Sequence, residues 1–206
     1  MKKVLVLGAS GAMGRYLLPH LAERGYRIDG VSLDGAGEFL PNVNHIRANA
    51  KERAVYRRLL ENGYDGIVDF LTYGTGELAW YLPQALDHTE HYIFLSSCRV
   101  FDDREHPVRE TSPRLIDTAG DELLRNSDDY CIYKARGENI LYAFPRRNWT
   151  IVRPATTYSL MRSQLVTLEA ADTVGRAFAG KKVVVPEQAR YRQATMSWGG
   201  DVARMI

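Results

Sequence analysis

Short apolar runs alternate with amphipathic segments along most of the 206-residue chain, an order that few folds accommodate. The apolar runs, expected to be strands, are residues 4–7, 27–33, 44–47, 66–71, 92–96 and 149–153. The segments with helical spacing are residues 14–24, 51–62, 77–86 and 128–144. Helical crossovers between successive strands predict a doubly wound α/β fold with a parallel sheet. Such sheets bind ligands at the carboxyl ends of their strands.

A glycine-rich loop follows the first strand and directly precedes a helix. Gly8, Gly11 and Gly14 recur at every third position in this loop. Glycines allow a tight turn and let the backbone approach a pyrophosphate at the helix N-terminus. The loop therefore predicts a dinucleotide site, formed by the three glycines together with Ser10, Ala12 and Met13.

Asp34 ends the second strand, about 20 residues beyond the last glycine, where dinucleotide-binding folds place an acid. A carboxylate at this place accepts hydrogen bonds from the ribose hydroxyls and repels a 2′-phosphate. It therefore favours NAD over NADP. Two alternatives stay open: Asp34-Gly35 is also a good turn sequence, and Arg15 could reach the phosphate of NADP.

Tyr130 and Lys134 are four residues apart in the predicted helix 128–144, so they lie on one face of it. Ser97 stands at the end of the fifth strand, and these three side chains converge at the carboxyl edge of the sheet. An ammonium group beside a phenol favours the ionised phenol and suits it to proton transfer. The alternative is a surface tyrosine beside a solvated lysine. Tyr133 is expected to pack or to contact substrate.

These motifs together resemble the short-chain dehydrogenase/reductase superfamily, particularly its extended NAD-dependent epimerase/dehydratase branch. The stretches that carry the resemblance are GASGAMG, VSLD, SSCRVF, YCIYK and IVRPATTYS. The resemblance implies a Rossmann-type sheet and NAD as cofactor. It makes Ser97, Tyr130 and Lys134 catalytic, with Tyr130 as the acid/base and Lys134 also holding the nicotinamide ribose. Further cofactor contacts are expected at Asn49, Leu71, Thr72, Tyr73, Ser96 and Pro154.

The resemblance also implies hydride transfer at a hydroxyl carbon, most commonly that of a nucleotide-activated sugar. Cys98 and Arg99 stand where the family's dehydratases place an acidic pair, which disfavours a sugar 4,6-dehydratase. Arg99 is expected either to meet a substrate phosphate or carboxylate or to be solvated. Cys98 is expected to be a small residue, either buried or at the edge of the pocket, and not a nucleophile.

A second hypothesis comes from the stretches VDFLTYG and HYIFLSSCRVF, which resemble an atypical subset that includes chloroplast stem-loop-binding proteins. It makes the chain a non-redox, cofactor-binding regulatory or RNA-interacting protein. The net charge of +2, with no evident basic stripe, makes a nucleic-acid partner the less favoured prediction.

We expect residues 1–158 to form the NAD(P)-binding domain and residues 159–206 a small, incomplete substrate-binding lobe. Within the lobe, residues 165–179 are predicted to be a helix and residues 183–185 a short strand. The final GGDVARMI reads as the opening of a helix.

A cytoplasmic homodimer without a metal is expected. Two cysteines without metal-ligand spacing suggest a reducing compartment, and the apolar run near the N-terminus is too short for a secretory signal. No apolar run is long enough to cross a membrane. The helices 77–86 and 128–144 are expected to pair across a twofold axis. The apolar residues assigned to that interface are Trp80, Leu82, Ile140, Leu141 and Phe144.

Overall fold

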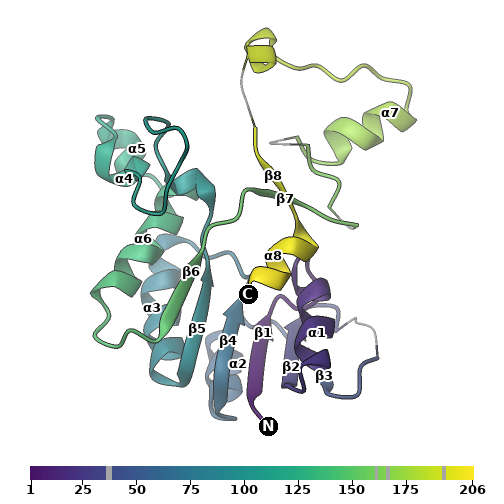
Figure 1. Ribbon diagram of the computed structural model, residues 1–206, viewed down its shortest axis with the longest axis vertical. Helices are drawn as coiled ribbons and strands as arrows, with labels where there is room; N and C mark the ends of the chain where they lie inside the picture. The colour runs from purple at the N-terminus through teal and green to yellow at the C-terminus, as the bar shows by residue number, and fades with distance from the viewer. Residues whose placement is uncertain (36–38, 161, 166–167, 192–193) are drawn as a thin grey trace.

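A six-stranded parallel sheet forms the centre of the protein in this computed structural model, which describes residues 1–35, 39–160, 162–165, 168–191 and 194–206 (Figure 1). Its strand order is β3-β2-β1-β4-β5-β6. The strands are β1 (Lys3–Leu7), β2 (Arg27–Ser32), β3 (Val43–Arg47), β4 (Tyr64–Asp69), β5 (Thr89–Leu95) and β6 (Trp149–Val152). The predicted Rossmann-type fold is confirmed. The strand order reverses between β1 and β4, which places the binding crevice at their carboxyl ends.

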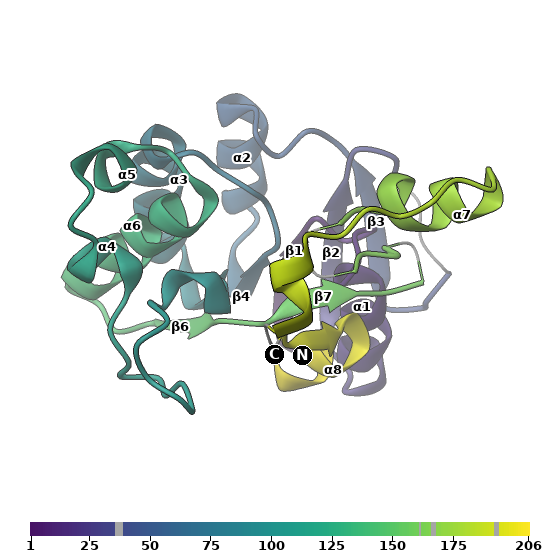
Figure 2. The ribbon, with the colours of Figure 1, turned by 90° about the horizontal axis from the view of Figure 1, so that it is seen from above.

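Helices cover both faces of the sheet (Figure 2). They are α1 (Gly14–Glu23), α2 (Arg53–Leu60), α3 (Thr75–Asp87), α6 (Tyr130–Ala143) and α8 (Gly199–Met205). Successive residues of β1 point to opposite faces. Leu5 and Leu7 belong to the core beneath α2, α3 and α6, whereas Val4 and Val6 pack with α1 and α8. Burial on both faces explains why the strands read as continuous apolar runs.

Two residues assigned to the dimer surface lie instead in the core of the protomer. The side chains of Leu82 and Leu141 are 0% exposed, and both belong to the cluster between the sheet and the helices α2, α3 and α6. Those two assignments were wrong. Trp80, Ile140 and Phe144 are partly buried against the same cluster.

The charged stretch from residue 101 to residue 127 holds short helices near the carboxyl edge of the sheet (Figure 1). They are α4 (Leu115–Thr118) and α5 (Glu122–Asn126), preceded by the 3₁₀ turn η1 (Cys98–Val100). Asp121 caps α5, because its side chain accepts hydrogen bonds from the backbone N–H groups of Leu123 and Leu124. The sequence predicted only an irregular segment here, since elements of four or five residues carry little helical periodicity.

The C-terminal part differs most from its prediction. β7 (Thr156–Tyr158) and β8 (Met196–Trp198) form a parallel two-stranded sheet that was not predicted. The predicted strand at residues 183–185 is wrong, because these residues form no regular element and Val184 is 78% exposed. Of the predicted helix 165–179, residues 166 and 167 lie outside the described residues. Helical structure occurs in a π-helical turn, Ala171–Gly175, and in α7, Arg176–Phe178.

The last residues return to the body of the fold. α8 packs against α1, and its Ala203 joins the core that contains Val4 and Val6. The predicted helix at GGDVARMI is therefore confirmed. Residues 199–206 therefore lie against the sheet, whereas the part of the chain that carries α7 rises above the carboxyl edge, as α4 and α5 do (Figure 1).

Candidate active site

The glycine loop has the backbone geometry that a dinucleotide needs. Gly8 has a φ of +81°, a left-handed conformation that disfavours other residues. A Cβ on Gly14 would lie only 2.5 Å from the carbonyl oxygen of Ala9, so α1 packs against the loop too closely for a side chain. Among the described residues, no side chain caps the N-terminus of α1. The first N–H groups of this helix are thus suited to a pyrophosphate, and the loop fits the predicted cofactor.

Asp34 and Asn49 follow the neighbouring strands β2 and β3, on the side where the adenosine half of a dinucleotide lies in this fold. Both residues are exposed. The side chain of Asn49 accepts a hydrogen bond of 3.1 Å from the backbone N–H of Lys51. Their placement agrees with the predicted roles in binding ribose and adenine, which stay predictions.

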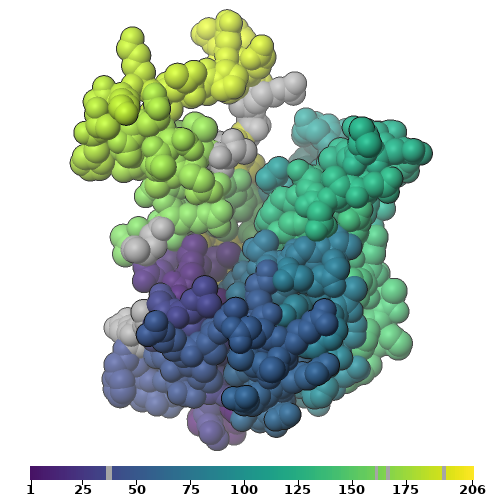
Figure 3. Space-filling view, turned by 180° about the vertical axis from the view of Figure 1, so that it is seen from behind, coloured from purple at the N-terminus to yellow at the C-terminus, as the bar shows by residue number. Residues whose placement is uncertain are grey.

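A pocket of about 380 Å³ opens at the carboxyl ends of the strands. It lies where the C-terminal segment and the stretch around residues 101–127 leave a hollow over the sheet (Figure 3). Ser97, Tyr130 and Lys134 all line it. Other predicted site residues in its wall are Met13, Thr72, Ser96 and Pro154. The structure thus brings the three predicted catalytic residues together beside the glycine loop.

The two tyrosines of α6 differ in exposure and not in their distance from the lysine. The Nζ atom of Lys134 lies 5.9 Å from the ring centre of Tyr130 and 5.7 Å from that of Tyr133. Tyr130 is 36% exposed and lines the pocket, whereas Tyr133 is 6% exposed and belongs to the core. Of these two tyrosines, Tyr130 is therefore the one whose side chain can meet a substrate in the pocket. Of the two roles expected for Tyr133, packing and substrate contact, its burial agrees with packing.

Lys134 is held deep in the wall of the pocket. Its side chain is 3% exposed, and its ammonium donates a 2.7 Å hydrogen bond to the carbonyl oxygen of Leu95. Burial lowers the pKa of Lys134 from its ordinary value of 10.5 to about 8, while the negative charge of Asp69 acts in the opposite direction. The lysine is thus a fixed point charge behind the phenol of Tyr130.

A buried acid, Asp69, ends β4 and was not predicted as part of the site. Its carboxylate accepts hydrogen bonds from the hydroxyls of Tyr73 (2.8 Å) and Tyr92 (2.9 Å) and from the N–H of Leu71 (2.9 Å). Burial raises the pKa of Asp69, and these hydrogen bonds and the charge of Lys134 oppose that rise. The acid inside the apolar run VDFL was the feature that could have revealed it.

The side chain of Tyr73 points into the core, so its predicted contact with the cofactor stays a prediction for the backbone alone. The side chain is 2% exposed, and its hydroxyl is bonded to Asp69 in the core. Leu71 likewise packs, as a partly buried residue, against the core cluster that contains Tyr73. Thr72, between them, is exposed and lines the pocket. The alternation of side chains at this strand end therefore leaves Thr72 as the residue that faces the pocket.

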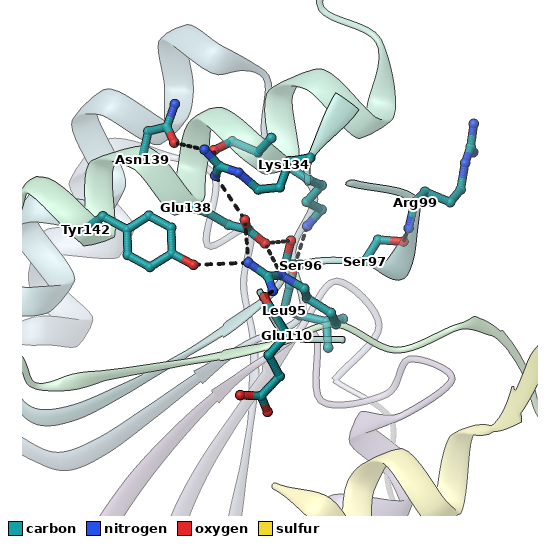
Figure 4. A network of polar contacts seen from close by, with 12 residues as sticks. Leu95, Ser96, Ser97, Arg99, Glu110, Lys134, Glu138, Asn139 and Tyr142 are labelled. Carbon is teal, nitrogen blue, oxygen red and sulfur yellow. Dashed lines mark hydrogen bonds and ion pairs between the residues drawn. The ribbon is translucent and has the colours of Figure 1, made fainter. Parts of the chain in front are cut away.

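Glu138 is the centre of a second buried network (Figure 4). Its carboxylate is 0% exposed and accepts hydrogen bonds from Ser96 (2.6 Å), from Arg114 (3.2 Å) and from two nitrogens of Arg153 (2.7 and 2.9 Å). The hydroxyl of Ser96 is therefore committed to Glu138, although the residue lines the pocket. Glu138 follows Lys134 by one helical turn, a spacing that could have pointed to it.

The model of the NAD-dependent epimerase/dehydratase family matches residues 4–193 of the chain. The chain belongs to this family. It is accordingly an enzyme, and its cofactor is NAD. The predicted family, enzyme class and cofactor are thereby confirmed.

Several solved structures share the fold. The Bordetella bronchiseptica enzyme WbmH, in complex with NAD⁺, has a TM-score of 0.75 at 18% identity, over 100% of this chain and 71% of that one. The Thermotoga maritima UDP-glucose 4-epimerase with UDP-glucose gives 0.71 at 17% identity, over 98% and 71%. A UDP-glucuronic acid 4-epimerase mutant from Bacillus cereus gives 0.73 at 15%, also over 98% and 71%. At these identities the likeness shows a common fold.

No curated protein matches the chain in sequence. Within the described ranges, no helix is both long enough and apolar enough to cross a bilayer. The described residues also include no cluster of three or more His, Cys, Asp or Glu side chains arranged to hold a metal ion.

Proposed function

We propose that this enzyme is an NAD-dependent epimerase or oxidoreductase that acts on a hydroxyl carbon of a nucleotide-activated sugar, with Tyr130 as the acid/base. The observation that carries the proposal is the shared pocket of Ser97, Tyr130 and Lys134 beside Met13 of the glycine loop. Two proteins of similar fold are a UDP-glucose 4-epimerase and a UDP-glucuronic acid 4-epimerase, which supports a nucleotide sugar as the substrate.

Each of the three residues has a distinct task in this proposal. Tyr130 takes the proton from the substrate hydroxyl, while Ser97 donates a hydrogen bond to the same oxygen. The hydroxyl oxygen of Ser97 already accepts a hydrogen bond of 3.3 Å from the backbone N–H of Arg99, which leaves its own proton to donate. When bound, NAD supplies the acceptor for the hydride that leaves the substrate carbon.

Lys134 acts as an electrostatic partner. Its ammonium is bonded to the carbonyl oxygen of Leu95, so its position does not depend on the substrate. A charge in such a buried place acts more strongly on a neighbouring phenol than it would in water. The positive charge therefore stabilises the phenolate form of Tyr130, which is the form that can accept the substrate proton.

The residues that follow Ser97 argue against dehydration. Removal of a hydroxyl group as water needs an acid to protonate it. Cys98 and Arg99 occupy the two positions after Ser97, and neither is a carboxylic acid. Among the described residues that line the pocket, one carries a carboxylate: Glu169, in the C-terminal segment. Inversion or oxidation at a hydroxyl carbon is the chemistry that the site supports best.

Incubation of the purified protein with NAD and a panel of nucleotide sugars tests the proposal. NMR of the sugar protons should detect a new epimer or a ketone from at least one of them. Loss of that product in the Tyr130→Phe variant would assign it to this site. Absence of a product with every nucleotide sugar, from a protein that binds NAD, would contradict the proposed substrate class.

A further inference from the structure

We propose that Arg99 forms a subsite for a carboxylate carried by the sugar ring itself, next to the carbon that reacts. This inference rests on the proposed function and specifies its substrate. Arg99 lies in η1, two residues after Ser97, and lines the pocket. Its guanidinium carbon lies 5.3 Å from the ring centre of Tyr130.

Arg99 has no ion-pair partner within the described part of the chain: no carboxylate oxygen comes within 4.0 Å of its guanidinium. By contrast, Arg114 and Arg153 are both paired with Glu138. In Figure 4 the side chain of Arg99 points away from that network. Its exposed guanidinium therefore has hydrogen-bond donors to offer to a ligand.

The charge of Arg99 acts on a nearby carboxylic acid, Asp129. Hydrogen bonds from Cys131, and more weakly the charge of Arg99, lower the pKa of Asp129. The carboxylate of Asp129 is already used, because it caps α6 by accepting from the backbone N–H of Cys131 at 3.1 Å. Asp129 keeps a negative charge near Arg99 without occupying its donors.

The charges that line the pocket favour an anionic ligand. The pocket wall carries the cations Arg99, Lys134 and Arg162 and, among the described residues, one carboxylate, that of Glu169. A cleft with an excess of one sign attracts ligands of the other. Lys134 is buried and already donates one hydrogen bond to the carbonyl oxygen of Leu95. Arg99 is the cation that offers donors on the side of Ser97 and Tyr130.

The position of Arg99 relates the anionic group to the reacting carbon. In the proposed mechanism Ser97 and Tyr130 both meet the reacting hydroxyl. The backbone of Arg99 is bonded to Ser97 and its guanidinium lies over the ring of Tyr130. An anionic group bound by the guanidinium would therefore lie close to that hydroxyl, as a substituent of the same sugar ring does. The planar guanidinium matches a carboxylate with two parallel hydrogen bonds, which makes a uronate-type sugar the fitting substrate.

A binding comparison between two nucleotide sugars tests this assignment. The protein saturated with NADH, which cannot oxidise a sugar alcohol, is titrated by calorimetry with UDP-glucuronate and with UDP-glucose. These ligands share the nucleotide and differ in having a carboxylate or a hydroxymethyl group on the ring. UDP-glucuronate should bind roughly 10-fold more tightly, the effect of one charge-assisted contact.

Substitutions at Arg99 then locate the preference. Arg99→Gln should abolish the preference for UDP-glucuronate, because it should lower the affinity for that sugar and change the affinity for UDP-glucose by less than about twofold. Arg99→Lys should keep part of it, because an ammonium retains the charge without the planar fork. Arg58→Gln, a change of the same type on the exposed surface of α2, should alter neither affinity. Unchanged NADH affinity checks that each variant is folded.

Two results would overturn the assignment. Equal affinity of the unmodified protein for both sugars would show that no carboxylate subsite exists, while the binding of UDP-glucose would leave the proposed function standing. If Arg99→Gln lowered the affinity for both sugars equally, Arg99 would contact a group that both ligands contain. If neither sugar binds to the NADH complex, the proposed substrate class fails together with this inference.

Discussion

The charge of Lys134 depends on a residue on the neighbouring strand β4. Asp69 supplies the negative charge that opposes the effect of burial on the pKa of Lys134. Removing it through Asp69→Asn should lower the pKa of Lys134 further below about 8. The lysine then loses its proton at a lower pH, so the alkaline fall in turnover should move downward by roughly one pH unit. The pH dependence of kcat measures this shift.

Tyr92→Phe is the matched control for that variant. It removes one 2.9 Å hydrogen bond to Asp69 but keeps the carboxylate charge. The change should lower stability by about 1–3 kcal/mol without moving the alkaline limb in the same direction. A kcat profile that is identical in the unmodified protein and in Asp69→Asn would show that Asp69 has only a structural role.

Helix α6 carries the catalytic pair, and Glu138 anchors it to three other parts of the chain. The carboxylate joins α6 to Ser96 after β5, to Arg153 after β6 and to Arg114 before α4. Glu138→Gln should leave two arginines with an incomplete partner and lower the free energy of unfolding by about 3–5 kcal/mol. Chemical denaturation measures the loss.

Glu122→Gln on α5 is the comparison for Glu138→Gln. The side chain of Glu122 is 80% exposed and has a long contact of 3.7 Å with Arg125. Its substitution should change stability by less than about 1 kcal/mol, as for other surface ion pairs. Similar losses in both variants would show that the buried network does not anchor α6.

Elements defined by local pattern were predictable, whereas those defined by distant partners were not. The run VLVL and the loop GASGAMG predicted β1 and the start of α1 almost to the residue. β7 and β8 were not predicted, because each has three residues and pairs with a segment about 40 positions away in the sequence. The β-branched residues 183–185 suggested a strand but find no neighbouring strand in the described structure.

The same limit applied to the site. The spacing of Tyr130 and Lys134 identified the pair, and the folded chain adds that Tyr130 is partly exposed whereas Tyr133 is buried. The roles of Asp69 and Glu138 depend on hydroxyls and guanidinium groups from other elements. Such partners become apparent only when the chain is folded.

The whole molecule is proposed to be a homodimer that pairs α3 and α6 across a twofold axis. Ile140 on α6 and Phe144 directly after it are partly buried, and the guanidinium groups of Arg53 and Arg57 lie over the ring of Trp80 on α3. Light scattering at micromolar concentration should give the mass of two chains. Ile140→Glu should give one chain with unchanged NAD affinity, since a charge at an interface opposes burial.

A monomeric mass for the unmodified protein would contradict the dimer. So would an Ile140→Glu variant that keeps the mass of two chains, because the pairing would then involve another face.

Turnover of Tyr130→Phe beside that of Tyr133→Phe is the most direct measurement of the proposed chemistry. Each change removes one hydroxyl and keeps the ring, and both rings lie at nearly equal distances from Lys134. Assayed with NAD and the nucleotide sugar that yields product, Tyr130→Phe should lose roughly 10²- to 10⁴-fold in kcat, while Tyr133→Phe stays near the unmodified rate. Full activity of Tyr130→Phe, with or without a loss in Tyr133→Phe, would contradict the assignment of Tyr130 as the acid/base.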